Sequence, residues 1–348
     1  DVSSGALLGG HRQQTIGRMA DENTVLMIQD TMDLNFSTRS HCKGLGSIGR
    51  NQTGTVSQGL KMHSRLALNT QGLPLGVLGT QIYAAESKPK GSVGRNSLPI
   101  EDKDSYRWLE CCEDAHDIGR KLRNVHIVCI GDRESDIFEL FDQHRRRGGP
   151  ADILVRAQHN RCLQGRDEKL FEYMEQGEPD GSASISVPRQ RGKKSKYRSP
   201  ARLSFPARTA EVEVRYREIT VCAPQTSRLK DRKPIVLSAI YLFERNPPPG
   251  ATQIKWMLLT TMQVHSLKQA MKCVRWYCMR WRIEEWHRVL KSGCGVLEHQ
   301  NQSNDTLART ISIDAVVAWR IMLLTLLGQK VPNLPCELLL NSWEFKVI

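Results

Sequence analysis

The stretch Ser266–Lys291, SLKQAMKCVRWYCMRWRIEEWHRVLK, predicts one long helix. Ser266 is a suitable N-cap with Gln269 three positions later, and no Pro or Gly interrupts the run before Gly293. Steps of three and four residues place one polar stripe on a single face of this helix: Tyr277, Arg280, Glu284, His287 and Lys291. Such a stripe is most often a solvated face with ion pairs. A carboxylate among phosphate-binding side chains would also suit a metal-binding helix that holds a polyanion.

Composition favours a nucleic-acid partner. The chain has 348 residues, enough for one large domain with an insertion or for two domains. Lys and Arg number 50 against 37 Asp and Glu, a formal net charge of +13, which is typical of proteins that bind polyanions. Charge alone does not separate DNA from RNA or from an anionic membrane. No apolar run of membrane-spanning length and no signal peptide are recognised, so we expect no membrane partner. The first residue is Asp rather than Met, and we expect the chain to begin partway through a longer protein.

The cysteine pattern argues against a structural zinc site. The ten cysteines form no CxxC pair and no Cys/His cluster with zinc-ligand spacing. We therefore expect free thiols in a reducing cytosol.

Two apolar runs of strand length each lead to an acidic residue. Val25–Ile28 is followed by Asp30, and Val125–Ile130 is followed by Asp132. An Asp at the end of a buried strand can present its carboxylate in a cleft, although for Asp30 an Asx turn or a helix cap is the commoner explanation. Both positions are therefore candidate site residues.

The remaining pattern predicts a mixed α/β sheet with a β-rich segment inside it. The predicted elements, in chain order, are a helix at 11–21, a Gly-rich loop at 42–60, a hairpin of Met62–Leu68 and Leu75–Tyr83, a helix at 103–122, a helix ending near 147, a strand at 152–157, strands at Ala183–Val187, Ala210–Val221 and Ile235–Glu244, a strand at Lys255–Thr260, and a core helix at Leu307–Leu327. The basic tract Arg189–Arg198 is either a solvated loop or a nucleic-acid contact.

Three carboxylates could converge in such a fold. In a ribonuclease-H-like sheet, the strands before Asp30 and Asp132 would lie side by side, and the helix with Glu284 would cross their ends. Carboxylates gathered there would repel unless divalent cations lay between them, and hard oxygen ligands suit Mg²⁺ or Mn²⁺. Two such ions about 4 Å apart stabilise the attacking and leaving oxygens of a phosphoryl transfer.

The chain resembles the DDE transposases of bacterial insertion sequences, in the cut-and-paste subgroup that forms hairpins on its DNA ends. The signature of that subgroup is Tyr, two residues, Arg, three residues, Glu, six residues, Lys, which Tyr277, Arg280, Glu284 and Lys291 match at every spacing. The other segments that carry the resemblance, which covers about residues 11–328, are Ile28–Thr31, Gly131–Ile137, Gly72–Gly76 and Ser105–Leu109. Met32 departs from the pattern, because the family usually has a second Thr there.

The resemblance implies a ribonuclease-H-like mixed sheet flanked by helices, with a β-rich insertion before the last catalytic helix. It implies that Asp30, Asp132 and Glu284 hold two Mg²⁺ ions, for which Mn²⁺ can substitute, and that the reaction proceeds by nicking, hairpin formation, hairpin opening and strand transfer. The residues predicted to contact DNA are Tyr277, Arg280, Lys291, Arg133 and Arg156, together with Trp256 and Trp281, which would stack on flipped bases. Trp256 could equally be a core residue at the start of a strand.

The predicted domains follow from the same resemblance. They are an N-terminal remnant at 1–24, the first part of the catalytic core at 25–161, the β-rich insertion at 162–252, the second part of the core at 253–328 and a tail at 329–348. The expected partners are double-stranded DNA, as transposon ends and target, and a second copy of the chain in a synaptic complex in the bacterial cytoplasm, associated with the nucleoid. The family's N-terminal DNA-recognition domain and C-terminal dimerisation region are not recognised, so a non-catalytic transposase regulator is the alternative. A simple metal-dependent nuclease of the same fold ranks last.

Overall fold

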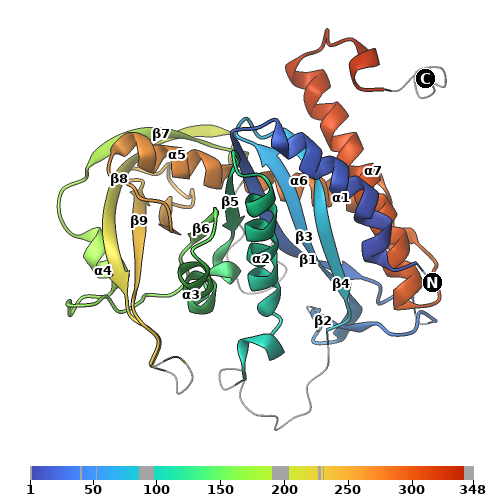
Figure 1. The fold of residues 1–348 in the computed structure, drawn as a ribbon, viewed down its shortest axis with the longest axis horizontal. Helices are drawn as coiled ribbons and strands as arrows, with labels where there is room; N and C mark the ends of the chain where they lie inside the picture. The colour runs from blue at the N-terminus through green and yellow to red at the C-terminus, as the bar shows by residue number, and fades with distance from the viewer. Residues whose placement is uncertain are drawn as a thin grey trace. The chain divides into compact units, whose positions relative to one another are not determined.

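The computed structural model describes residues 2–39, 41–51, 53–85, 98–189, 204–225, 229 and 231–340 (Figure 1). The chain forms two compact units. Unit 1 comprises Asp1–Ser92, Lys121–Ile127 and Met279–Ile348, and unit 2 comprises Val93–Arg120 and Val128–Cys278. Strand β5 (His126–Gly131) begins in unit 1 and ends in unit 2. Both units combine strands with helices, as the sequence predicts for a mixed α/β protein.

Unit 1 contains an antiparallel sheet centred on β3. Strand β3 (Val56–Asn69) pairs along one edge with β1 (Thr24–Asn35), and along the other with β2 (Gly46–Arg50) and then β4 (Pro74–Tyr83). The β3–β4 hairpin confirms the prediction for this stretch, and its turn contains Gly72 with a positive φ of 78°.

The structure corrects two sequence predictions in this sheet. Strand β2 and the start of β3 lie in the Gly-rich stretch that was predicted to be a loop. A Cβ on Gly59 would lie 2.0 Å from the Leu34 carbonyl oxygen, so glycine here permits a close approach of two backbones rather than a flexible loop. Strand β1 continues to Asn35, so Asp30 lies within the strand, opposite Ser64, and not at its end.

Helices cover this sheet. They are α1 (Ser4–Ala20), α6 (Trp281–Arg288) and α7 (Asn304–Lys330), with short turns η4 (Val289–Gly293, a π-helix), η5 (Val296–Glu298) and η6 (Cys336–Leu338). Helices α1 and α7 pack against β4 and against each other, and α6 packs against β1. Helix α1 begins earlier than predicted because the Ser3 hydroxyl accepts a hydrogen bond from the Ala6 N–H at 3.2 Å and caps it.

Helix α7 is only partly the core helix that was predicted. Its buried side includes Trp319, whose indole N–H donates to the Pro74 carbonyl at 2.9 Å. Ile313, Val317 and Ile321, spaced by four residues, are 53%, 45% and 39% exposed. By length and composition alone, α7 could cross a membrane, which corrects the expectation that no run reaches that length. Core helices of soluble proteins pass the same test.

The long helix predicted at 266–291 is interrupted. Helix α5 (Leu267–Cys278) ends before α6 begins, and the N–H groups of Arg282 and Ile283 donate three residues back, to Met279 and Arg280, at 2.9 and 3.2 Å. This tight turn contains no Pro or Gly, so the sequence carries no signal for it. The boundary between the units falls here, and Tyr277 lies in unit 2 whereas the rest of the polar stripe lies in unit 1.

Unit 2 contains a mixed sheet whose outer part is a β-meander. In pairing order the strands are β5, β6 (Ala151–Arg156), β10 (Lys255–Thr260), β9 (Ile235–Phe243), β8 (Arg208–Val221) and β7 (Gly181–Val187). From β6 outward all neighbours are antiparallel, whereas β5 and β6 are joined through helix α3 (Phe138–Arg147), the connection typical of parallel strands. The strands predicted between residues 183 and 260 are therefore confirmed.

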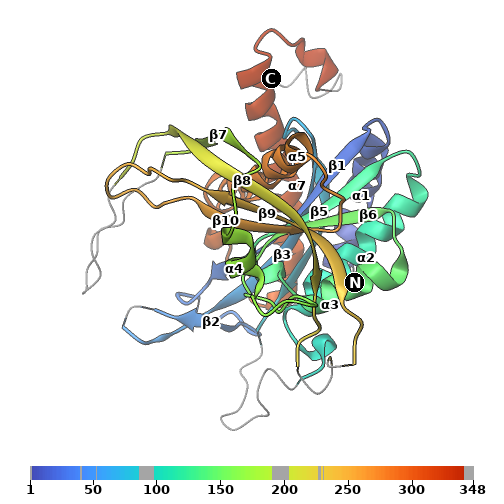
Figure 2. The ribbon, with the colours of Figure 1, turned by 90° about the vertical axis from the view of Figure 1, so that its left-hand side faces the viewer.

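Helices flank both faces of the unit 2 sheet. In Figure 2, α5 lies on one side of the outer strands, and α3 and α4 (Leu170–Glu175) lie on the other. Helix α2 (Tyr106–Lys121) confirms the helix predicted at 103–122, and two short turns, η2 (Ile100–Asp102) and η3 (Arg133–Ser135), complete the unit. This architecture is compatible with a ribonuclease-H-like fold. Apart from Arg189, the basic tract at 189–198 lies outside the described residues.

We predict that Gly76→Ala destabilises unit 1 by about 1–3 kcal/mol, because overpacking forces neighbouring groups apart. A Cβ at Gly76 on β4 would lie 2.0 Å from the Thr15 hydroxyl on α1. Gly9→Ala on α1 is the control, since nothing lies within 4 Å of that Cβ and alanine favours a helix. Urea unfolding measures both. Equal stability of the two variants would contradict the close packing of α1 on β4.

Candidate active site

Two of the predicted catalytic carboxylates meet in unit 1 at a single guanidinium group. Arg280 Nη1 lies 3.6 Å from Asp30 Oδ2, and Arg280 Nη2 lies 2.6 Å from Glu284 Oε1. The three side chains are 15–34% exposed, so they are partly shielded but reachable from solvent. The structure therefore brings Asp30 and Glu284 together around one positive charge, although they are far apart in the sequence.

Helix α6 orients Glu284 through the opposite side of the helix. Ile283 and Trp286 are fully buried, and the Trp286 indole N–H donates to the Ala315 carbonyl on α7 at 3.2 Å. Arg280 stands one turn before Glu284, immediately ahead of the helix, so their ion pair is a local i,i+4 contact. Burying the apolar side of α6 leaves this polar side at the surface.

A buried hydrogen-bond network supports Asp30 from within the sheet. The Thr31 N–H donates to Asp30 Oδ1 at 3.0 Å, and the Thr31 hydroxyl lies 2.7 Å from Nδ1 of His63 on β3. His63 Nε2 lies 3.3 Å from the side-chain oxygen of Gln29, and both residues are 1% exposed. Sequence reasoning missed His63. Only the β1–β3 register, which the structure provides, places His63 directly opposite Thr31.

Asp132 lies in unit 2, directly after β5. Its carboxylate caps η3 by accepting the Glu134 N–H at 2.8 Å, and its side chain is half-exposed. The preceding residue, Gly131, leaves no room for a side chain, because a Cβ there would lie 2.3 Å from the Ser135 hydroxyl. That hydroxyl donates to the Asp132 carbonyl at 2.6 Å. This capping role leaves the Asp132 side chain half-exposed.

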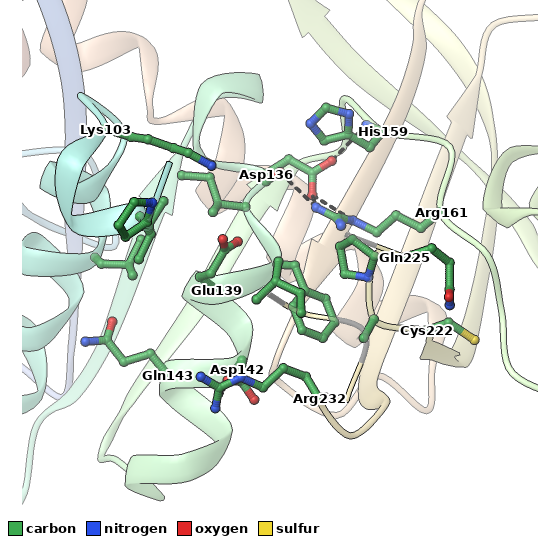
Figure 3. A pocket seen from close by; sticks show the side chains of 18 of the residues that line it. Lys103, Asp136, Glu139, Asp142, Gln143, His159, Arg161, Cys222, Gln225 and Arg232 are labelled. Atoms are coloured by element: carbon green, nitrogen blue, oxygen red, sulfur yellow. Dashed lines mark hydrogen bonds and ion pairs between the residues drawn. The ribbon is translucent and has the colours of Figure 1, made fainter. Parts of the chain in front are cut away.

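Asp136, four residues later, is fully buried, and both of its carboxylate oxygens accept hydrogen bonds from the protein (Figure 3). Its Oδ2 accepts the backbone N–H groups of Gln158 and His159 at 2.7 and 2.9 Å. Its Oδ1 accepts Nε of Arg161 at 3.1 Å, and Arg161 also donates to the Asp136 carbonyl at 2.8 Å. Of the two Asp residues in this motif, Asp132 is therefore the one available to a ligand.

The carboxylates that meet at Arg280 suit a hard divalent cation. Oxygen ligands are those that Mg²⁺ and Mn²⁺ prefer, and a guanidinium already provides positive charge between Asp30 and Glu284. Across the described residues, no group of three or more His, Cys, Asp or Glu side chains is close enough to hold a metal ion. Because Asp132 belongs to the other unit, the three-carboxylate site stays a prediction.

The remainder of the stripe in unit 1 is strongly desolvated. Lys291 lies in the π-helical turn η4, where burial lowers its pKa and the nearby charge of Asp33 partly opposes this shift. His287 is 7% exposed, and its Nε2 has no hydrogen-bond partner among the residues that the structure describes. Burial, and then the charges of Lys291 and Arg280, lower the pKa of His287 to about 3, so its imidazole is neutral at physiological pH.

The predicted DNA contacts in unit 2 include an aromatic cluster. The Trp256 and Tyr277 rings meet edge to face with centroids 5.8 Å apart, and the Arg156 guanidinium lies over Trp256 at 5.5 Å. Tyr277 is buried at 6% exposure, whereas Trp256 is half-exposed. Arg133 in unit 2 and Trp281 in unit 1 are both exposed.

No protein-family model matches the chain. Among solved structures, the chain is similar to the piggyBac transposase in a cryo-EM structure of its synaptic complex with hairpin DNA. The sequence identity is 10% and the TM-score is 0.40, over 90% of this chain and 50% of that chain. This chain therefore spans half the length of the transposase it matches.

We predict that Asp136→Ala destabilises unit 2 by about 3–5 kcal/mol, because it leaves the Arg161 guanidinium buried without its partner. Asp132→Ala is the matched control and should cost no more than about 1 kcal/mol, the usual loss for a helix-cap residue. Urea unfolding followed by circular dichroism measures both. A larger loss for Asp132→Ala than for Asp136→Ala would reverse the roles assigned to the two carboxylates.

A second prediction concerns acid stability. Because the folded-state pKa of His287 is about 3 against an ordinary value of 6.5, the unfolded chain binds a proton that the folded chain does not, and stability falls as the pH drops below 6.5. Between pH 7 and 5, the protein should lose about 2 kcal/mol more stability than His287→Gln. The control is His41→Gln, at an exposed position in unit 1, which should behave like the unchanged protein. Equal pH slopes for all three proteins in denaturant titrations would contradict the shift.

Proposed function

We propose that this protein is a DNA transposase of the DDE type, which cuts and joins DNA by metal-dependent phosphoryl transfer at transposon ends. The observation that carries the proposal is the meeting of Asp30 and Glu284 at Arg280. These are two of the three carboxylates of the family pattern, together with the arginine of the Tyr-Arg-Glu-Lys signature. The net charge of +13 supports DNA as the substrate.

Asp30 and Glu284 are the proposed metal ligands in unit 1, and Asp132 is the proposed third ligand. When bound, two Mg²⁺ or Mn²⁺ ions would stabilise the attacking and leaving oxygens of an in-line displacement. Asp30 is held for this role by the Thr31 backbone and the His63 network, and Glu284 by the buried side of α6.

Arg280 has two proposed states. Without a cation, its guanidinium neutralises Asp30 and Glu284. With a cation bound, Asp30 and Glu284 would hold it, and the Arg280 guanidinium would instead bind a DNA phosphate, with which it can form paired hydrogen bonds. Lys291 and Tyr277, the other signature residues, are proposed to hold the phosphates near the transposon end, with Arg133 and Arg156 as further DNA contacts.

Trp256 is proposed to receive a base flipped out during hairpin formation, and Trp281 to serve as a second stacking position. Arg156 over Trp256 and Tyr277 at its edge would hold the indole in place for a stacked base. The exposed indole of Trp281, 51% accessible, suits the same chemistry. We also propose a homodimer that pairs two transposon ends, in the bacterial cytoplasm.

We predict that Asp30→Asn and Glu284→Gln each reduce DNA nicking by at least about a hundredfold, because each removes a metal-ligand charge. Asp132→Asn should do the same. Glu285→Gln is the matched control, since this neighbouring carboxylate pairs with Arg282 and should leave nicking unchanged. The assay uses a supercoiled plasmid carrying the element's own ends, with Mg²⁺ or Mn²⁺, and gel analysis of nicked and hairpin products. DNA binding without any cleavage by the unchanged protein would favour the regulator.

We predict that Trp256→Ala slows hairpin formation by about tenfold or more and leaves first-strand nicking nearly unchanged, because only the hairpin needs an unstacked base. Trp256→Phe should restore part of the rate, since a π-face remains. End-labelled DNA separates the two products on a denaturing gel. Equal slowing of both steps would make Trp256 a packing residue.

A further inference from the structure

Two cysteines in unit 2 face each other across an antiparallel pairing. The Cys222 N–H donates to the Cys162 carbonyl at 2.9 Å, and the Gln164 N–H donates to the Thr220 carbonyl at 2.8 Å, on either side of the bridge between Leu163 and Val221. This pattern makes Cys162 and Cys222 directly opposite residues in a hydrogen-bonded position, where Cα atoms are about 5.5 Å apart. Disulfides usually join Cα atoms about 4.4–6.8 Å apart, so the backbone already has the required spacing.

Both thiols lie on the accessible side of this pairing. Side chains alternate along a strand, and the intervening Leu163 and Val221 are 4% and 1% exposed, so they point into the core. Cys162 is exposed and Cys222 is half-buried, and both contribute to the wall of a cavity of about 820 Å³. Figure 3 shows Cys222 in that wall. Burial and the neighbouring Cys162 raise the pKa of the Cys222 thiol, which supports their proximity.

We propose that Cys162 and Cys222 form a reversible disulfide when the protein meets a small-molecule disulfide such as oxidised glutathione. The Cys162 thiolate, the more exposed, attacks one glutathione sulfur and expels the first glutathione thiolate. The Cys222 thiolate then attacks the Cys162 sulfur and expels the second glutathione. The two cysteine protons pass to the expelled thiolates, so two protein thiols are oxidised while one oxidised glutathione is reduced to two thiols. This inference is independent of the proposed function.

The cross-link would close a long loop within unit 2. The segment between the two cysteines contains α4, β7 and β8, and a bond between its ends restricts the unfolded chain. It would also restrict motion of one wall of the cavity. Arg161, next to Cys162, forms an ion pair with the buried Asp136, and both residues line that wall. Oxidation should therefore stabilise unit 2 and hold this wall in a single arrangement.

The test treats the folded chain of residues 1–348 with oxidised glutathione, blocks free thiols by alkylation, and maps peptides without reduction. We expect a peptide pair joined through Cys162 and Cys222, loss of two hydrogens in the intact mass, and a Tm higher by about 5–10 °C. Dithiothreitol should reverse all three changes. A wild-type protein that does not react, that stops at a glutathione adduct, or that joins a different cysteine pair would overturn the proposal.

Single variants separate proximity from general reactivity. In Cys222→Ser, the reaction at Cys162 should stop at the glutathione adduct, and Cys162→Ser should form no internal cross-link to Cys222. The matched control is the Cys112–Cys129 pair, whose thiols also interact but are 2% and 1% exposed. Cys112→Ser should therefore leave the oxidation product unchanged. Loss of the cross-link in Cys112→Ser would assign the reaction to the wrong pair and overturn the proposal.

Discussion

The ion pairs of Arg280 with Asp30 and Glu284 are the interaction on which the site in unit 1 depends. Two partly buried carboxylates repel each other strongly where water is scarce, so they can share a site only with positive charge between them. Arg280 supplies that charge from the same helical face as Glu284.

Buried groups on both sides hold this arrangement in place. Behind Asp30, the network of Thr31, His63 and Gln29 satisfies its own polar atoms inside the sheet, and a satisfied buried network is rigid. Behind Glu284, apolar burial of Ile283 and Trp286 fixes the rotation of α6. A polar hydrogen-bond network therefore orients Asp30, and the burial of apolar side chains orients Glu284.

Asp132 and Asp136, which both follow β5, have the same side chain but different environments and therefore different roles. Asp136 accepts backbone N–H groups and an arginine in a fully buried position, so removing it would strand a charge. Asp132 caps a single short turn, and its side chain is half-exposed. The sequence singled out Asp132 by its place after the strand, and the structure separates it from the buried carboxylate of Asp136 by burial and hydrogen bonding.

The sequence by itself determined the elements with strong local patterns. Apolar alternation and turn residues predicted the β3–β4 hairpin and the strands β7 to β10, and helical spacing placed Arg280 and Glu284 on one face. These features depend on near neighbours in the chain. The tertiary structure alone decided the rest: the interruption of the long helix near Met279, the extension of β1 beyond Asp30, the glycines that serve close strand approach, and the support from His63. The extension of β1, the close approach at Gly59 and the support from His63 result from contact between segments distant in sequence, which leaves no pattern in the local sequence. The interruption of the helix is marked by no Pro or Gly, so it too could be read only from the structure.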